Sequence, residues 1–130
     1  MNIHESAEDY LEAILILQER KGAVRSIDIV REKNFTKPSV SVAMKRLREN
    51  GYIEMDADGF ITLLPPGEEI AQRIYTRHRL LSQFLKNLGV SPEAAAADAC
   101  KIEHDISAES FDKIVAFARA HGLLDKAVEQ

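Results

Sequence analysis

The chain has 130 residues, 45% hydrophobic and 29% charged, which suits one ordinary globular domain or two small modules. No apolar run approaches the roughly 20 residues that cross a bilayer, and the first ten residues lack the basic-then-apolar order of a secretory signal. Because Cys100 is the single cysteine, no internal disulfide can form, and we expect a reducing, cytoplasmic setting with no membrane partner. The net charge of −4 argues at first against nucleic acid.

This charge is unevenly distributed along the chain. Between Arg20 and Arg48, nine lysines and arginines stand against two acids, Asp28 and Glu32, which gives this segment a charge of +7 and the remainder −11. A run of charge is usually a solvated face, but this one coincides with a specific helical pattern. The distribution therefore restores nucleic acid as a candidate partner.

The first half of the chain has the periodicity of three helices. Apolar residues at helical spacing predict a helix over 5–21. Ser26 caps a short second helix over 27–33, and Thr36 caps a third that ends at Asn50. The apolar positions predicted for the second and third helices are Ile27, Val30, Val40, Met44 and Leu47.

Two short β-prone runs follow, over 52–55 and 60–63, and they flank an Asp58-Gly59 hairpin turn. The segment Pro65-Pro66-Gly67 closes this unit. Helix, short helix, turn, helix and hairpin is the order of a winged helix-turn-helix.

The second half of the chain is helical. A long helix is predicted from about Glu68 to Asn87, with a stripe of apolar residues that includes Leu88. Ser91 caps a helix that runs to about Asp105, and Ser107 caps a last amphipathic helix.

These elements predict a mainly α protein with a small β-hairpin. We place a winged helix-turn-helix DNA-binding domain at 1–64 and a second, helical domain at 65–130, to which the side chains and the resemblance described below assign metal binding and dimerisation. A recognition helix presents its N-terminal residues to base edges in the major groove, while flanking basic residues hold phosphates. The candidate DNA-binding residues are Arg25, Lys37, Pro38, Ser39, Ser41, Val42, Lys45 and Arg46.

Three groups of side chains are candidates for chemistry. Asp9 and Glu12, three residues apart on one helical face, are usually a solvated pair, and a lone histidine such as His78 in an apolar stripe is more often a core residue. Cys100, Glu103 and His104 change that balance, because their spacing projects a thiolate, a carboxylate and an imidazole from one face within about one turn. Such a set suits a divalent transition metal, although a cysteine nucleophile with a histidine base remains open.

Several segments together resemble the diphtheria-toxin-repressor/manganese-transport-regulator family, over residues 5 to about 120. They are SAEDYLEAILIL, KPSVSVAMKRLRENGYI, ITLLPPGEEIA, RHRLLSQFL and ACKIEHDIS. The resemblance implies a metal-dependent winged-helix repressor, most simply of metal-uptake genes, that acts as a homodimer on a palindromic double-stranded DNA operator. The candidate dimer interface lies on the last two predicted helices, at Ile102, Phe111, Ile114 and Val115.

The resemblance also implies a ligand set, matched position by position. Asp9 and Glu12 match acidic ligands of the manganese branch, whereas Cys100 matches the iron branch. The ligands common to both branches are matched by His78, Glu103 and His104. The set is a hybrid, so we expect one well-formed site for Mn²⁺ or Fe²⁺, with Zn²⁺ or Co²⁺ as alternatives.

Two other functions keep the winged helix without a metal switch. In one, the helical half is a plain dimerisation or protein-interaction module. In the other, Cys100 is a thiol-based redox sensor, whose DNA binding would respond to peroxide rather than to chelator. No oxyanion-hole signature or glycine-rich loop accompanies these residues, so we do not expect an enzyme.

Overall fold

The computed structural model describes residues 5–33 and 35–124, which form two compact units. The first unit ends at Arg73 and the second begins at Ile74. This division falls inside one helix, α4 (Pro65–Asn87), and not at the boundary between 64 and 65 that the sequence predicts for the two domains. No helix within the described ranges has the length and apolarity to cross a bilayer.

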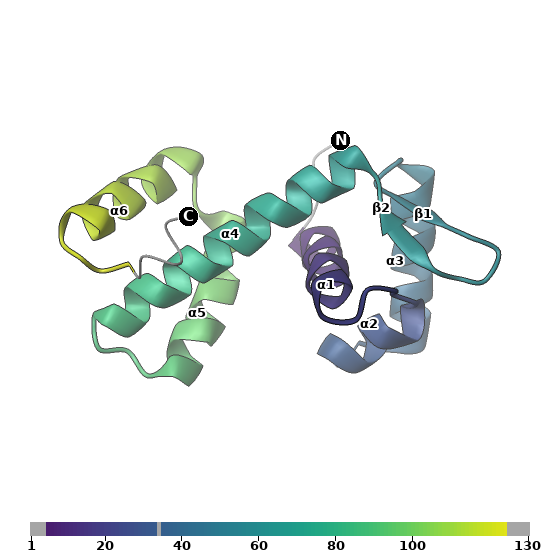
Figure 1. Cartoon of the computed structure of the whole chain (residues 1–130), viewed down its shortest axis with the longest axis horizontal. Helices are drawn as coiled ribbons and strands as arrows, with labels where there is room; N and C mark the ends of the chain where they lie inside the picture. Colours follow the sequence, from purple (N-terminus) through teal and green to yellow (C-terminus); the bar gives the residue numbers. More distant parts are fainter. Residues whose placement is uncertain (1–4, 34, 125–130) are drawn as a thin grey trace. The chain divides into compact units, whose positions relative to one another are not determined.

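The N-terminal unit contains three helices and a hairpin, in the order of a winged helix-turn-helix (Figure 1). The helices are α1 (Glu5–Lys21), α2 (Ser26–Lys33) and α3 (Lys37–Glu49), and the strands are β1 (Ile53–Met55) and β2 (Ile61–Leu63). Helix α3 begins where predicted, since the Thr36 hydroxyl accepts a hydrogen bond of 3.2 Å from the Ser39 N–H.

The core of this unit follows the predicted apolar pattern except in α2. Val40, Met44 and Leu47 are buried on the inner face of α3, as predicted. In α2, however, the fully buried residue is Ile29, whereas Ile27 and Val30 are half-buried. An eight-residue helix has too few turns for its own periodicity to show which position is the most buried.

The wing is a two-stranded antiparallel sheet, with Ile53 paired to Leu63 and Met55 to Ile61. Ile61 also donates a backbone hydrogen bond of 2.8 Å to the Val24 carbonyl, which attaches the wing to the segment before α2. At the tip, the Asp56 carboxylate accepts hydrogen bonds of 2.9 Å from two backbone N–H groups, and Gly59 has a φ of 86°. The turn thus includes the predicted Asp58-Gly59 pair but is organised by Asp56.

Helix α4 begins at Pro65, three residues before the predicted position at Glu68. Pro65 and Pro66 occupy its first turn, where the missing N–H groups have no helical partner to lose. Gly67 packs directly against the wing: a Cβ atom at this position would lie 2.1 Å from the carbonyl oxygen of Tyr52. This close approach explains the glycine, whereas the two prolines suit the first turn of the helix.

The C-terminal unit contains the remainder of α4, α5 (Pro92–Asp105) and α6 (Ala108–Ala120). Ser91 and Ser107 cap α5 and α6, as predicted. Its core consists of Leu80, Val115, Ala118 and Leu124, with Phe84, Phe111 and Leu123 packed against them. Leu88, which the sequence pattern includes in the apolar stripe of α4, is 57% exposed.

Candidate DNA interface and metal centre

The N-terminal half of α3 presents an exposed, mixed surface. Helix α3 buries one stripe of apolar side chains and leaves its other faces accessible, and Val42 is 52% exposed although it is apolar. All the predicted DNA-binding residues are exposed, namely Arg25, Lys37, Pro38, Ser39, Ser41, Val42, Lys45 and Arg46. An exposed valine is suited to contact with a thymine methyl group, and the basic side chains around it are suited to contact with the neighbouring phosphates.

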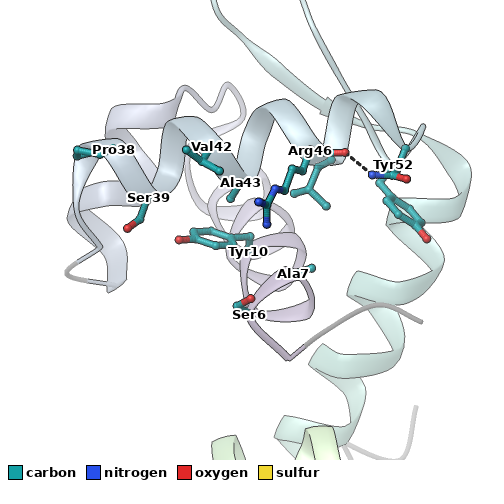
Figure 2. A pocket seen from close by; sticks show the side chains of 11 residues that line it. Ser6, Ala7, Tyr10, Pro38, Ser39, Val42, Ala43, Arg46 and Tyr52 are labelled. Atoms are coloured by element: carbon teal, nitrogen blue, oxygen red, sulfur yellow. Dashed lines mark hydrogen bonds between the residues drawn. The ribbon is translucent and has the colours of Figure 1, made fainter. Parts of the chain in front are cut away.

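Helix α3 stands between two hollows within the N-terminal unit. The larger, of about 760 Å³, lies between α1 and α3, where Tyr10 and Ser6 face Ser39, Val42 and Arg46 (Figure 2). A second hollow of about 320 Å³ is lined by residues on the other side of α3 and by residues of α2. The exposed edge of α3 is therefore a ridge that is accessible from both sides.

The positive segment is partly neutralised by ion pairs between α1 and α2. Arg20 makes two hydrogen bonds to the Glu32 carboxylate, at 2.8 and 2.9 Å, and Lys21 pairs with Asp28. Arg25 lies at the wing instead, with its guanidinium carbon 4.2 Å from the centre of the Phe60 ring. The cations on α3 and at the wing are thus the stronger candidates for phosphate contacts.

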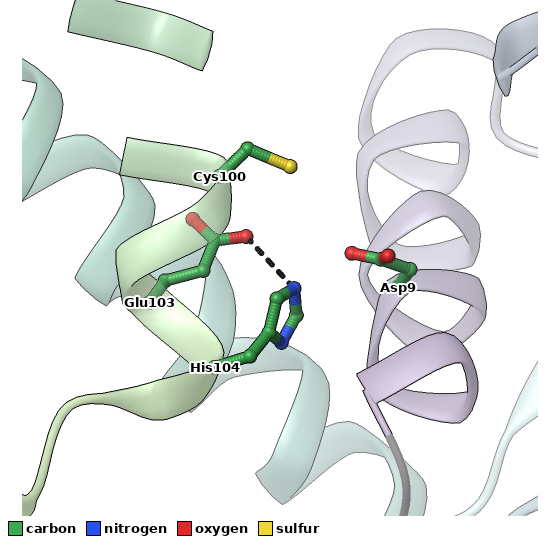
Figure 3. A group of neighbouring side chains, drawn as sticks. All are labelled: Asp9, Cys100, Glu103 and His104. Carbon is green, nitrogen blue, oxygen red and sulfur yellow. Dashed lines mark ion pairs between the residues drawn. The ribbon is translucent and has the colours of Figure 1, made fainter. Parts of the chain in front are cut away.

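The C-terminal unit brings three of the predicted metal ligands together on α5. Cys100, Glu103 and His104 project from the same side of the helix (Figure 3), and each offers a ligand atom within 4.8 Å of the others. The His104 Nε2 atom lies 3.4 Å from Glu103 Oε1. A sulfur, an oxygen and a nitrogen donor at this separation match the first-row divalent metals.

Glu103 is the centre of this group. Its side chain is 0% exposed, and its Oε2 atom lies 2.8 Å from the Nδ1 atom of His78 on α4. Within the described part of the chain, Oε1 accepts no hydrogen bond, and its contact with the His104 Nε2 atom is a longer one of 3.4 Å. Burying a carboxylate without satisfying both oxygens is costly, so the site fits a cation that would be bound by Oε1.

Asp9 and Glu12 belong to α1 in the N-terminal unit. They lie three residues apart, with Asp9 half-buried and Glu12 only 2% exposed. That burial sets Glu12 apart from an ordinary solvated helical acid. Asp9 and burial together raise the pKa of the neighbouring Tyr10, burial being the larger cause. The role of both acids as metal ligands remains a prediction.

The sequence reasoning missed Arg77. Its guanidinium donates hydrogen bonds to the backbone carbonyls of Glu103, at 3.1 Å, and Ile106, at 2.9 Å. It also missed the ion pair of 3.2 Å between Arg73 and the buried Glu8. Neither pairing has a local signal, because the partners are at least 26 residues apart in the chain.

Two family descriptions match the chain. Residues 2–59 match "Iron dependent repressor, N-terminal DNA binding domain", and residues 65–120 match "Iron dependent repressor, metal binding and dimerisation domain". Among relatives, the transcriptional regulator MntR of Salmonella typhimurium is 38% identical over 118 residues, which cover 91% of this chain and 75% of that protein. The MntR regulator of Lysinibacillus sphaericus is 37% identical over 109 residues, covering 84% and 78%.

Solved structures are also similar. The manganese regulator SloR has a TM-score of 0.78 at 27% identity, covering 92% of this chain. A manganese-dependent transcriptional repressor in complex with manganese has a TM-score of 0.78 at 29% identity, covering 85%. The chain spans 55% and 51% of those two proteins. The chain therefore belongs to the DtxR/IdeR/MntR family of metal-dependent, DNA-binding transcriptional repressors.

Proposed function

We propose that this chain is a homodimeric repressor that binds a palindromic operator when a divalent metal is bound, and that it acts in the cytoplasm on genes of metal uptake. The observation that carries the proposal is the fully buried Glu103 carboxylate, grouped with Cys100 and His104 and hydrogen-bonded to His78. Burying a carboxylate beside a thiol and an imidazole destabilises a core that has only a structural role. The same three groups are suitable ligands for a divalent cation.

We propose six metal ligands in all: Asp9, Glu12, His78, Cys100, Glu103 and His104. The first two supply hard oxygen donors, which favour Mn²⁺, whereas the Cys100 thiolate favours Fe²⁺, Co²⁺ or Zn²⁺. Several similar proteins carry manganese in their names, which supports Mn²⁺. Mn²⁺ and Fe²⁺ are thus the leading candidates. A thiolate ligand at Cys100 would favour Fe²⁺ over Mn²⁺.

The regulation would follow from the position of these ligands in the sequence. Asp9 and Glu12 precede the helix-turn-helix, and the other four belong to the helical half. A bound ion would supply a cross-link between the two. In a two-fold dimer the two α3 helices must be about 34 Å apart, or a multiple of that, to read a palindrome. If the bound ion restricts that spacing in advance, DNA binding loses less conformational entropy in ordering the two helices.

At the DNA, Ser39, Ser41 and Val42 are proposed to contact base edges. Arg25, Lys37, Lys45 and Arg46 are proposed to hold phosphates on either side. Because Ser pairs with several bases, the operator sequence does not follow from these residue types.

The experiment has two parts. Elemental analysis of protein purified without added metal measures bound metal per chain, and a DNA titration measures affinity before and after chelation. The DNA is a fragment selected from a random-sequence pool in the presence of Mn²⁺. Stoichiometric metal and chelator-sensitive binding support the proposal. Metal-free protein that binds equally well in chelator supports the plain dimerisation module, and a response to peroxide alone supports the redox sensor.

Two variants sharpen this experiment. Glu103→Gln keeps the shape of the side chain and removes its charge, so metal should be lost while the helices remain. Glu109→Gln, an exposed acid in the first turn of α6, is the matched control. Cys100→Glu should move selectivity toward Mn²⁺. Unchanged selectivity in Cys100→Glu would show that Cys100 is not a ligand.

A further inference from the structure

Arg77 joins three elements of the C-terminal unit. From α4, one nitrogen of its guanidinium, Nη1, donates hydrogen bonds to the carbonyl oxygens of Glu103 and Ile106, at 3.1 and 2.9 Å. Its guanidinium carbon lies 5.4 Å from the centre of the Phe111 ring on α6. The planar, permanently charged guanidinium can make both kinds of contact at once, which a lysine cannot.

The two carbonyls are among those that the end of α5 leaves without a helical donor. The last four carbonyls of a helix lack the N–H group four residues later. At the end of α5, the Ile106 N–H donates to the Ile102 carbonyl, and the chain then turns extended, with a ψ of 138° at Ile106. The Glu103 and Ile106 carbonyls accept from Arg77, and its positive charge also faces the negative end of the helix dipole.

Arg77 and its neighbour His78 hold the same residue by different atoms. Arg77 binds the Glu103 backbone carbonyl, and His78 binds the Glu103 carboxylate at 2.8 Å. We propose that Arg77 is a positioning residue for the metal centre: by holding the last turn of α5 in helical form, it keeps the side chains of Cys100, Glu103 and His104 convergent. This inference rests on the proposed metal-binding function.

The convergence of the three ligands depends on the helical form of α5 between them. Residues spaced i, i+3 and i+4 share one face only while the intervening turn is helical. Glu103 and His104 are among the last three residues of α5, where helices fray most easily. Releasing the Glu103 carbonyl would therefore separate two of the donor atoms from the Cys100 sulfur.

The test uses the full chain, freed of metal and titrated with Co²⁺, whose visible absorption reports the geometry of its ligands. Arg77→Met removes the donors and keeps much of the apolar stem, and Arg77→Lys keeps the charge without the planar fork. Arg79→Met is the matched control, because Arg79 is exposed on the same helix and its guanidinium lies 4.9 Å from the Tyr75 ring centre. Competition with a chelator of known affinity gives the dissociation constant.

We expect Arg77→Met to weaken Co²⁺ binding by about 10-fold or more and to change the absorption bands at saturation. Arg77→Lys should fall between Arg77→Met and the wild type, and Arg79→Met should match the wild type. If Arg77 contributes stability alone, both Arg77 variants will unfold at lower temperature yet show the wild-type bands and affinity when folded, and the inference is overturned. A wild type that binds no Co²⁺, Mn²⁺ or Fe²⁺ would instead refute the proposed function itself.

Discussion

Gly67 allows a severe test of how the wing and α4 fit together. Replacing it with alanine adds a methyl group whose carbon would lie 2.1 Å from the Tyr52 carbonyl oxygen and 3.0 Å from the carbonyl carbon. Ordinary contact needs more than 3 Å, so the backbone of one partner must move by about 1 Å. The Tyr52 oxygen also accepts a hydrogen bond of 3.0 Å from the Leu64 N–H, which the movement would stretch.

Gly67→Ala changes the free energy of unfolding through terms of opposite sign. Forcing a methyl group into a packed contact costs about 1–3 kcal/mol, and losing the hydrogen bond costs about 1 kcal/mol more. Alanine recovers about 1 kcal/mol through its helix propensity. We therefore expect Gly67→Ala to lower the free energy of unfolding by about 1–3 kcal/mol, which for a domain of this size is roughly 4–12 °C in Tm.

Thermal unfolding followed by far-ultraviolet circular dichroism measures this difference, in chelator so that metal binding adds nothing. Glu69→Ala, at an exposed position of the same helix, changes helix propensity without a clash and should shift Tm little. A Gly67→Ala protein as stable as the wild type, or more stable, would show that α4 does not pack against the Tyr52 carbonyl as described.

Three further predictions concern the N-terminal unit. Thr36→Ala removes the cap of α3 and should cost about 1 kcal/mol in urea unfolding, with weaker DNA binding; equal stability would contradict the cap. Arg46→Ala should reduce the slope of log affinity against log salt by about 1, whereas Lys86→Ala, outside this unit, should not; equal slopes would remove Arg46 from the phosphate contacts. The Lys21 ammonium, hydrogen-bonded to Asp28, holds the pKa of that carboxyl below its ordinary 3.8. A depressed pKa stabilises the fold above pH 3.8 and loses that effect as the pH falls through the folded-state value, so Asp28→Asn should flatten the acid limb of a stability–pH curve. An unchanged acid limb would contradict this.

The features that could be predicted from the sequence depend only on residues three or four positions apart, within one helical turn or one N-cap. Thr36, Ser91 and Ser107 each accept from the N–H three residues later, and that chemistry is local. The grouping of Cys100 and His104 follows equally from their spacing, which holds for any regular helix.

The features that could not be predicted depend on contacts between distant segments. The sequence of α2 does not reveal that Ile29 rather than Ile27 enters the core, because the packing against α1 and α3 decides it. The capping of α5 by Arg77 depends on how α4 passes the end of that helix. The beginning of α4 at Pro65 was not predicted because Pro-Pro-Gly is typical of a turn. Only the structure shows that Gly67 is required by the nearby Tyr52 carbonyl.

The central claim is that metal at Glu103 and its neighbours controls DNA binding. The most direct measurement is the affinity for one operator fragment, by fluorescence anisotropy, with Mn²⁺, with Fe²⁺ under anaerobic conditions, and with chelator. A coupling of about 1–3 kcal/mol predicts an affinity roughly 5- to 150-fold higher with the activating metal, and by linkage an equal tightening of metal binding by DNA. Equal affinity in chelator and in every metal would contradict the account.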